Sequence, residues 1–150
     1  AIISNCRLGN SLNAERAAAI AIYHDATEII TGDMPTPVKY FNEDIQDAYK
    51  KVERAATDKL LSMLPEDIRG CYESMFIVKE EDAYLWRLVK AADKLSALIK
   101  CIEERKAGNS EFINAEASIT AILKKLNLPE VEIFMEEFLP AYEKSLDELS

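Results

Sequence analysis

Two long segments of this chain place apolar side chains at the three- and four-residue spacing of an α-helix. A strand pattern would alternate every second residue instead. One such stripe runs from about 43 to 63 and another from about 81 to 107. Because amphipathic helices without strands bury their apolar faces only against one another, the sequence predicts an all-α helical bundle. The second stripe consists of Leu85, Leu88, Val89, Ala92, Leu95, Ile99 and Ile102.

Capping and breaking residues predict where the remaining helices begin and end. Asn13 is a suitable N-cap for a long apolar helix, which Gly32, Pro35 and Pro37 bring to an end. Pro140 is expected to bend the last helix. Neither an alternating strand pattern nor an internal repeat is found in the sequence. The predicted helices span about 14–30, about 43–63, a short segment opened by Pro65, about 81–107, about 111–126 and about 130–148.

Length and charge restrict the classes of partner. The 150 residues fit a single domain, and 27 acidic against 18 basic residues give a net charge of -9. Such a charge repels nucleic acid polymers but leaves room for a small anion held by local donors or a metal ion. No apolar run is long enough for a bilayer and no signal peptide is recognisable, so no membrane partner is expected. Three unpaired cysteines suit a cytoplasmic protein.

The final helices carry many acids, which are expected to form a solvated face. Between them lie apolar residues that can pack on the core or on a second subunit, including Phe134 and Phe138. The acids are Glu130, Glu132, Glu136, Glu137, Glu143, Asp147 and Glu148.

Ionisable residues interrupt the apolar helix expected over 14–30. His24 is the only histidine in the sequence, and Asp25 follows it directly. On a helix, Glu28 lies about 40° from His24, so all three side chains can face one cavity. Imidazole and carboxylate are ligands for divalent metals, and a third carboxylate can move protons. The alternative is a core histidine hydrogen-bonded to Asp25; the cost of burying three ionisable groups favours the metal.

Two longer stretches, one of which contains His24, Asp25 and Glu28, resemble a known protein family. "YHDATEIITGDMPTPVKYFN", from Tyr23 to Asn42, and "LVKAADKLSALIKCIEE", from Leu88 to Glu104, resemble the bacterial 5'-deoxynucleotidases of the HD-domain phosphohydrolase superfamily. The similarity continues through "NAER" at 13–16, "AGN" at 107–109 and "SLDE" at 145–148, and so covers nearly the whole chain.

The resemblance implies a helical HD-domain fold around one divalent metal ion, cobalt or manganese or a similar ion. It implies that His24, Asp25 and Asp93 bind the metal and that Glu28 acts as general acid or base. Periodicity by itself places Asp93 at the border of the apolar stripe, as a solvated residue. The implied reaction is hydrolysis of deoxyribonucleoside, or ribonucleoside, 5'-monophosphates to nucleoside and phosphate, and a homodimer is expected. The implied substrate contacts are Asp25, Asp33, Met34, Pro35, Thr36 and Asp93.

One feature of the family pattern has no counterpart here. The family site uses another histidine on an upstream helix, whereas this sequence begins at Ala1-Ile2-Ile3. We therefore expect an N-terminally incomplete HD domain, with weak metal affinity and little activity unless the upstream segment is supplied. Two other functions stay open: an HD phosphohydrolase for another phosphoester, such as a nucleoside triphosphate or cyclic nucleotide, and a non-catalytic helical module whose site is vestigial.

Overall fold

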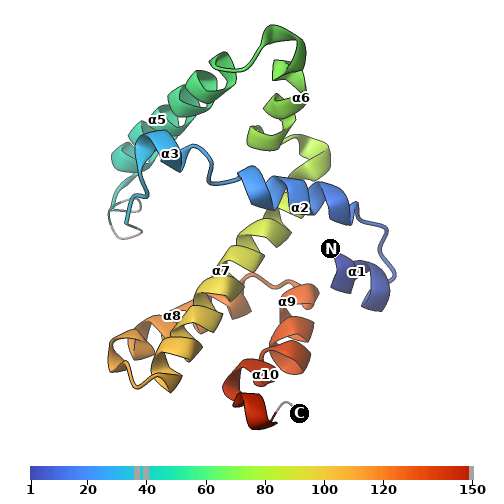
Figure 1. Cartoon of the computed structure of the whole chain (residues 1–150), viewed down its shortest axis with the longest axis vertical. Coiled ribbons are helices and arrows are strands. Elements are labelled where there is room, and N and C mark those ends of the chain that lie inside the picture. The colour runs from blue at the N-terminus through green and yellow to red at the C-terminus, as the bar shows by residue number, and fades with distance from the viewer. Residues whose placement is uncertain (36–37, 39–40, 149–150) are drawn as a thin grey trace. The chain divides into compact units, whose positions relative to one another are not determined.

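Helices make up the regular structure throughout the described part of the chain. The computed structural model describes residues 1–35, 38 and 41–148, and these residues contain no strand (Figure 1). The predicted all-α class is therefore confirmed. The chain divides into two compact units, one of Ala1–Ala17 with Tyr84–Ser150 and one of Ala18–Ala83. The single domain expected from the length stays a prediction.

The unit of residues 18–83 contains the end of α2 (Ala14–Tyr23), α3 (Glu28–Thr31), α5 (Glu43–Ser62) and α6 (Glu66–Phe76). The bounds of α5 confirm the helix expected over 43–63. It begins where the Asn42 side chain accepts a hydrogen bond from the Ile45 amide at 2.8 Å. Pro65, expected in the first turn of a short helix, is the N-cap directly before α6.

The other unit is organised around α7 (Ala83–Lys106), whose start follows a short 3₁₀ turn, Glu80–Asp82. With it pack α8 (Ile113–Lys125) and α9 (Pro129–Ile133), and α1 (Ile2–Arg7) packs on α9. Another 3₁₀ turn, Ser110–Phe112, leads into α8. The buried core of this unit consists of Leu88, Ala91, Leu95, Leu98, Ile102, Leu123, Leu128 and Val131.

The buried face of α7 lies slightly to one side of the predicted stripe. Ala91 and Leu98 are buried, whereas Ala92 is exposed and Ile99 is half-buried. Both of the latter line a cavity instead. The periodicity located the apolar side of α7, but the elements that pack on it decided which residues are covered.

The helix expected over 130–148 is broken into short pieces. After α9 comes one π-helical turn, Phe134–Phe138, in which the Leu139 amide bonds to the Phe134 carbonyl at 2.9 Å. Then follow α10 (Pro140–Glu143) and a 3₁₀ turn, Leu146–Glu148. Pro140 has no backbone N–H to continue the helical hydrogen bonds, which explains why the regular α-helix does not run through this segment.

The acidic face predicted for this region is correct except at one position. Glu132, Glu136 and Glu137 are exposed, as are the acids nearer the C-terminus, Glu143, Asp147 and Glu148. Glu130, however, is only 5% exposed. Its carboxylate accepts hydroxyl hydrogen bonds from other helices, which a helical pattern cannot reveal.

Two smaller expectations concern the membrane and the thiols. Among the described residues, no helix combines the length and apolar character needed to cross a membrane. Cys6 and Cys71 are exposed and Cys101 is buried, and all three are free. Burial raises the pKa of the Cys101 thiol, with the Glu116 carboxylate adding to the effect.

Candidate metal site

The expected helix over 14–30 is interrupted at the histidine. α2 ends at Tyr23, a tight turn covers 24–27, and α3 begins at Glu28. Within the turn, backbone amides bond three residues back: Ala26 to the Tyr23 carbonyl at 3.0 Å and Glu28 to the Asp25 carbonyl at 2.9 Å. Bonds of this 3₁₀ type tighten the chain. His24 and Asp25 therefore lie on a turn and not inside a continuous helix, which corrects the prediction.

The histidine ring itself provides a physical reason for this break. His24 Nδ1 lies 2.8 Å from the Ala21 carbonyl oxygen. In a regular α-helix that carbonyl would accept from the Asp25 amide, four residues on. A side chain that takes over a backbone acceptor competes with the helix. The sequence gives no warning of the break, because residues 23–27 contain neither glycine nor proline.

The same contact decides which ring nitrogen is available for a ligand. A carbonyl oxygen only accepts, so Nδ1 carries the hydrogen that it donates to Ala21. In the neutral ring, Nε2 then presents a lone pair, and it lies 2.9 Å from Asp25 Oδ2. Two acceptors at this distance repel each other unless a proton or another cation lies between them.

These atoms fit a divalent ion by their chemistry and by their separation. In octahedral geometry, neighbouring ligand atoms held about 2.1 Å from an ion and about 90° apart lie about 3 Å from one another. The 2.9 Å between His24 Nε2 and Asp25 Oδ2 agrees with that value. The hydrogen bond from Nδ1 to a backbone carbonyl is the kind of contact that fixes the tautomer of a metal-binding histidine.

Solvent reaches the two side chains to different extents. The His24 side chain is 14% exposed and that of Asp25 is 51% exposed. The cost of burying several charges therefore does not apply to Asp25. The orientation of the two groups supports the metal site instead.

Aromatic packing fixes the residue before the turn. The ring of Tyr23 meets that of Tyr72 edge-on, with centroids 5.9 Å apart, and that of Phe76 at 6.0 Å. Both partners belong to α6. Such pairs contribute about 0.5–1.5 kcal/mol beyond area burial. α6 thus holds the end of α2, from which His24 projects.

Glu28 and the following loop lie next along the chain. The half-buried Glu28 begins α3 and its amide bonds to the Asp25 carbonyl, so the turn and α3 are directly joined. Gly32 ends α3 with φ 70° and ψ 164°. Its carbonyl accepts from the hydroxyls of Thr31 at 2.9 Å and Tyr49 at 3.4 Å, which ties the start of the loop to α5.

The predicted substrate loop is described only in part. Asp33 and Pro35 are exposed and Met34 is half-buried. Thr36, the fourth residue predicted to contact substrate, lies outside the described residues. Asp33, Met34 and Pro35 directly follow Gly32, whose carbonyl is hydrogen-bonded, so the loop begins at a fixed point after α3.

Asp93 lies on α7, in the other unit. Its side chain is 43% exposed and its Oδ2 is 3.3 Å from Lys94 Nζ. Both observations agree with the solvated border position that periodicity predicts. Its assignment as a metal ligand stays a prediction from resemblance.

Sequence reasoning missed the groups that orient the site. The Ala21 carbonyl and the Tyr49 hydroxyl fix His24 and Gly32 respectively. Every residue has a backbone carbonyl, so the sequence cannot show which one accepts the hydrogen bond from His24. Tyr49 lies 17 residues from its partner and belongs to a regular apolar stripe, so nothing in the pattern distinguishes it.

Comparison with known proteins gives a consistent result. The family model described as "5'-deoxynucleotidase YfbR-like" matches residues 1–142. A 5'-deoxynucleotidase of Erwinia tasmaniensis is 45% identical over 150 residues, which are all of this chain and 76% of that protein. One of Shewanella oneidensis is 45% identical over 149 residues, 99% of this chain and 76% of that protein.

A solved structure supports the fold. The crystal structure of an HD-domain phosphohydrolase from Listeria innocua superposes with a TM-score of 0.74 at 23% identity, over 94% of this chain and 68% of that one. At this identity the likeness concerns the fold, and it agrees with the predicted HD-domain helical bundle.

Proposed function

The chain belongs to the YfbR-like 5'-deoxynucleotidase family, and we propose that it hydrolyses deoxyribonucleoside 5'-monophosphates to nucleoside and phosphate. The family makes it a hydrolase of small nucleotides. The observation that carries the proposed site is the His24–Asp25 pair, whose Nε2 and Oδ2 atoms face each other at a distance that a proton or a metal ion between them would stabilise.

His24 and Asp25 would hold a divalent ion through Nε2 and Oδ2, and Asp93 would complete the protein ligands. The support for Asp93 is the resemblance of the segment from Leu88 to Glu104. A mixed imidazole and carboxylate set suits cobalt, manganese or a similar ion. When bound, such an ion neutralises phosphate charge and makes a water molecule acidic enough to act as nucleophile.

Glu28 would act as the proton-transfer group. As a carboxylate it can accept a proton from the attacking water, and as a carboxylic acid it can protonate the leaving 5' oxygen. Its amide bond to the Asp25 carbonyl keeps it one turn from the proposed ligands. Position matters here, because an error of about 1 Å costs much of the benefit of orientation.

The loop after Gly32 would hold the nucleoside part of the substrate. Asp33 can accept a hydrogen bond from a sugar hydroxyl, and Met34 with Pro35 can provide an apolar wall. Asp25, Asp93 and Thr36 complete the proposed set of substrate contacts. The anchored Gly32 carbonyl limits how far this loop can move.

Phosphate release from deoxy- and ribonucleoside monophosphates, with cobalt added and the upstream segment supplied, tests this function. Glu28→Gln is expected to lower the rate by about 10²-fold while cobalt binding persists. The matched control is Asp47→Asn, because that carboxylate lies in the same unit and its side chain is 69% exposed. Equal rates for Glu28→Gln and the control would reject the assigned role of Glu28.

The same assay distinguishes the alternatives. Faster hydrolysis of a nucleoside triphosphate or a cyclic nucleotide would support a different phosphoester substrate. Cobalt binding without hydrolysis of any of these compounds would favour a non-catalytic module. The homodimer also stays a prediction, for which sedimentation equilibrium is the direct measurement.

A further inference from the structure

The first part of α7 is positively charged, although the chain as a whole has a net charge of -9. From 83 to 100 the sequence contains one acid, Asp93, and four basic residues, which are Arg87, Lys90, Lys94 and Lys100. The potential at a site depends on its nearest charges more than on distant ones. This segment can therefore attract an anion that the rest of the surface repels.

Two of the four basic side chains have partners away from Asp93. The Lys100 ammonium lies 2.6 Å from Glu104 Oε1, one turn further along α7. The Arg87 guanidinium lies over the ring of Tyr84, 5.7 Å from its centre. The positive charge next to Asp93 therefore comes from the other two residues, Lys90 and Lys94.

Lys90 and Lys94 flank Asp93 on the surface of α7. Lys90 precedes Asp93 by three residues, and residues at this spacing are neighbours on a helix. Lys94 Nζ lies 3.3 Å from Asp93 Oδ2. At a rise of about 1.5 Å per residue, the two lysines begin about 6 Å apart along the helix axis. Their flexible four-carbon stems allow both ammonium groups to reach one anion beside Asp93.

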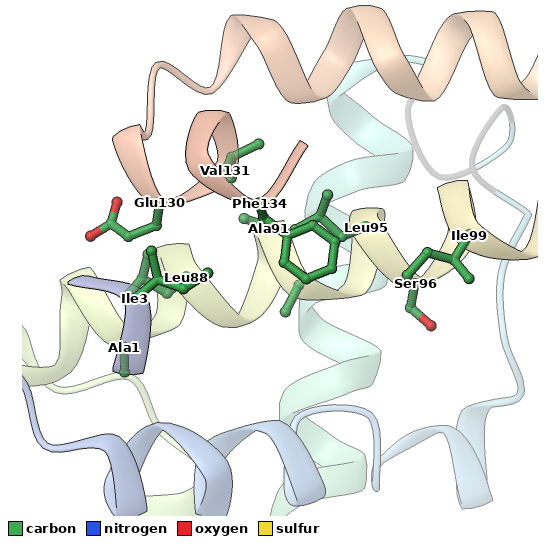
Figure 2. A pocket seen from close by; sticks show the side chains of 11 residues that line it. Ala1, Ile3, Leu88, Ala91, Leu95, Ser96, Ile99, Glu130, Val131 and Phe134 are labelled. Atoms are coloured by element: carbon green, nitrogen blue, oxygen red, sulfur yellow. The ribbon is translucent and has the colours of Figure 1, made fainter. Parts of the chain in front are cut away.

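The other side of α7 is apolar and faces the core of its own unit. Leu88, Leu95 and Ile99 line a cavity of about 280 Å³ together with Phe134 (Figure 2). At about 100° per residue, Lys90 lies about 140–160° around the helix from Leu88 and Leu95. Lys90 is accordingly exposed, so its charge is available to a ligand in solvent.

Neither lysine is held firmly by the protein. Lys90 makes no ion pair or hydrogen bond with any residue in the described part of the chain. The 3.3 Å between Lys94 and Asp93 exceeds the length of a strong ionic hydrogen bond, about 2.7–2.9 Å, and the two side chains are 42% and 43% exposed. Like charges four residues apart also disfavour a helix. An anion bound between the two ammonium groups would remove this repulsion.

We propose that Lys90 and Lys94 bind the phosphate group of the substrate beside Asp93. The inference rests on the proposed function, which supplies a nucleoside monophosphate as the anion and Asp93 as a metal ligand. A phosphate monoester carries about -1.5 to -2 charge at pH 7, whereas the other charged residues proposed for the site are acids. Once Asp93 binds a divalent ion its charge is balanced, and Lys94 can exchange that carboxylate for a phosphate oxygen.

Binding of inorganic phosphate to the cobalt-loaded chain, with the upstream segment supplied, tests this proposal by calorimetry. Lys90→Ala and Lys94→Ala are each expected to weaken phosphate binding about tenfold, because each removes a charged hydrogen-bond donor. Lys100→Ala is the matched control and is expected to leave phosphate binding unchanged. Lys100 is an exposed lysine on the same helix whose charge is paired with Glu104.

Cobalt affinity and turnover provide readouts that a purely structural role would not produce. Lys94→Ala removes a cation next to Asp93, so cobalt is expected to bind about threefold more tightly while phosphate binds more weakly. In the hydrolysis of a deoxyribonucleoside monophosphate, both alanine variants are expected to raise KM about tenfold and to change kcat little. That pattern indicates contacts made equally in the bound substrate and in the transition state.

Unchanged phosphate affinity in either alanine variant, or an equal loss in Lys100→Ala, would overturn the proposal. Weaker binding of both cobalt and phosphate in Lys94→Ala would also overturn it, because Lys94 would then support the structure around Asp93. A wild-type chain that binds cobalt but no phosphate would reject the phosphate site whatever its turnover. A wild-type chain that binds phosphate through these lysines but hydrolyses no nucleoside monophosphate would reject the proposed function alone.

Discussion

The His24–Asp25 turn and the Glu130 cluster, which consists of Glu130 and the Ser4 and Tyr84 hydroxyls bonded to it, both place a carboxylate within hydrogen-bonding distance of another polar atom, but with opposite consequences. At Glu130 the partners are hydroxyls, which donate, and the carboxylate is buried and satisfied. At Asp25 the partner is a ring nitrogen whose other side already donates to Ala21, and the carboxylate is half exposed. A satisfied carboxylate stabilises structure, whereas one that faces a second acceptor has capacity for a cation.

Burial accounts for this difference. A buried polar group that lacks a partner costs about 1–3 kcal/mol, so a site such as Glu130 persists only if donors surround it. Asp25 is half exposed, so water can hydrogen-bond to its carboxylate. The turn therefore does not need protein donors for every carboxylate oxygen. Substitutions in the two regions are therefore expected to have different effects. Those at the His24–Asp25 turn should affect ligand binding, and those at Glu130 should affect stability.

The largest expected effect is at His24. Replacing it in His24→Ala removes a proposed metal ligand, so cobalt-dependent hydrolysis is expected to fall by about 10³-fold. Cobalt binding, measured by calorimetry, is expected to disappear, while the free energy of unfolding changes by only about 1 kcal/mol. Retained cobalt binding in this variant would contradict the assigned site.

Glu130→Gln is expected to affect stability and not metal binding. Hydrogen bonds to an ionised carboxylate are stronger than those to a neutral amide. Their weakening in this variant is expected to lower the free energy of unfolding by about 1.5–3 kcal/mol. Cobalt binding is expected to persist. Urea titration of this variant beside Glu132→Gln measures the effect, and matching midpoints would show that the buried cluster adds no stability.

The pH dependence of the same variant provides a separate test. Burial would raise the pKa of Glu130, but hydrogen bonds from Ser4, from its own backbone and from Tyr84 lower it below its usual range. Because the folded pKa of Glu130 is lowered, its contribution to stability is present above the ordinary glutamate pKa and is lost as the pH falls through the folded value. The wild-type chain is expected to lose more stability than Glu130→Gln between about pH 5 and the onset of acid unfolding. Parallel curves of unfolding free energy against pH would contradict this.

A smaller effect is expected where α3 meets the substrate loop. Gly32→Ala introduces a side chain at φ 70° and ψ 164°, a backbone region that costs other residues about 1–3 kcal/mol. No atom lies within 4 Å of the added methyl group, so the cost is conformational. Gly70→Ala in α6 is the control and is expected to stabilise by about 0.5–1 kcal/mol. Thermal unfolding distinguishes the two, and equal shifts would reject the backbone argument.

The smallest expected effect belongs to the exposed pair between Arg7 and Glu137. Arg7→Ala removes a solvated ion pair, which contributes about 0.2–1 kcal/mol. The comparison with Ser4→Ala on the same helix is informative, because Ser4 is the buried contact. A larger loss for Arg7→Ala than for Ser4→Ala would place the main attachment of α1 on the surface.

The sequence predicted some parts of this molecule well because their signals are local. Asn13 accepts a hydrogen bond from the Arg16 amide at the start of α2, and Pro65 precedes α6, since caps and prolines act on their own neighbours. The resemblance carried by Tyr23 to Asn42 led to the correct family. The helix break at His24 could not be predicted, because it depends on the His24 ring bonding to one backbone carbonyl. No glycine, proline or other helix-breaking residue marks that contact in the sequence.

The amino-acid sequence by itself determined the helical class, the positions of α5, α7 and α8 and the residue types of the proposed metal site. These depend on interactions between residues close together in the chain. The tertiary structure decided that Glu130 is buried and that Ser4 and Tyr84 satisfy it. The reason is that a carboxylate's burial depends on donors from distant segments: Ser4 lies 126 residues away and Tyr84 lies 46 away.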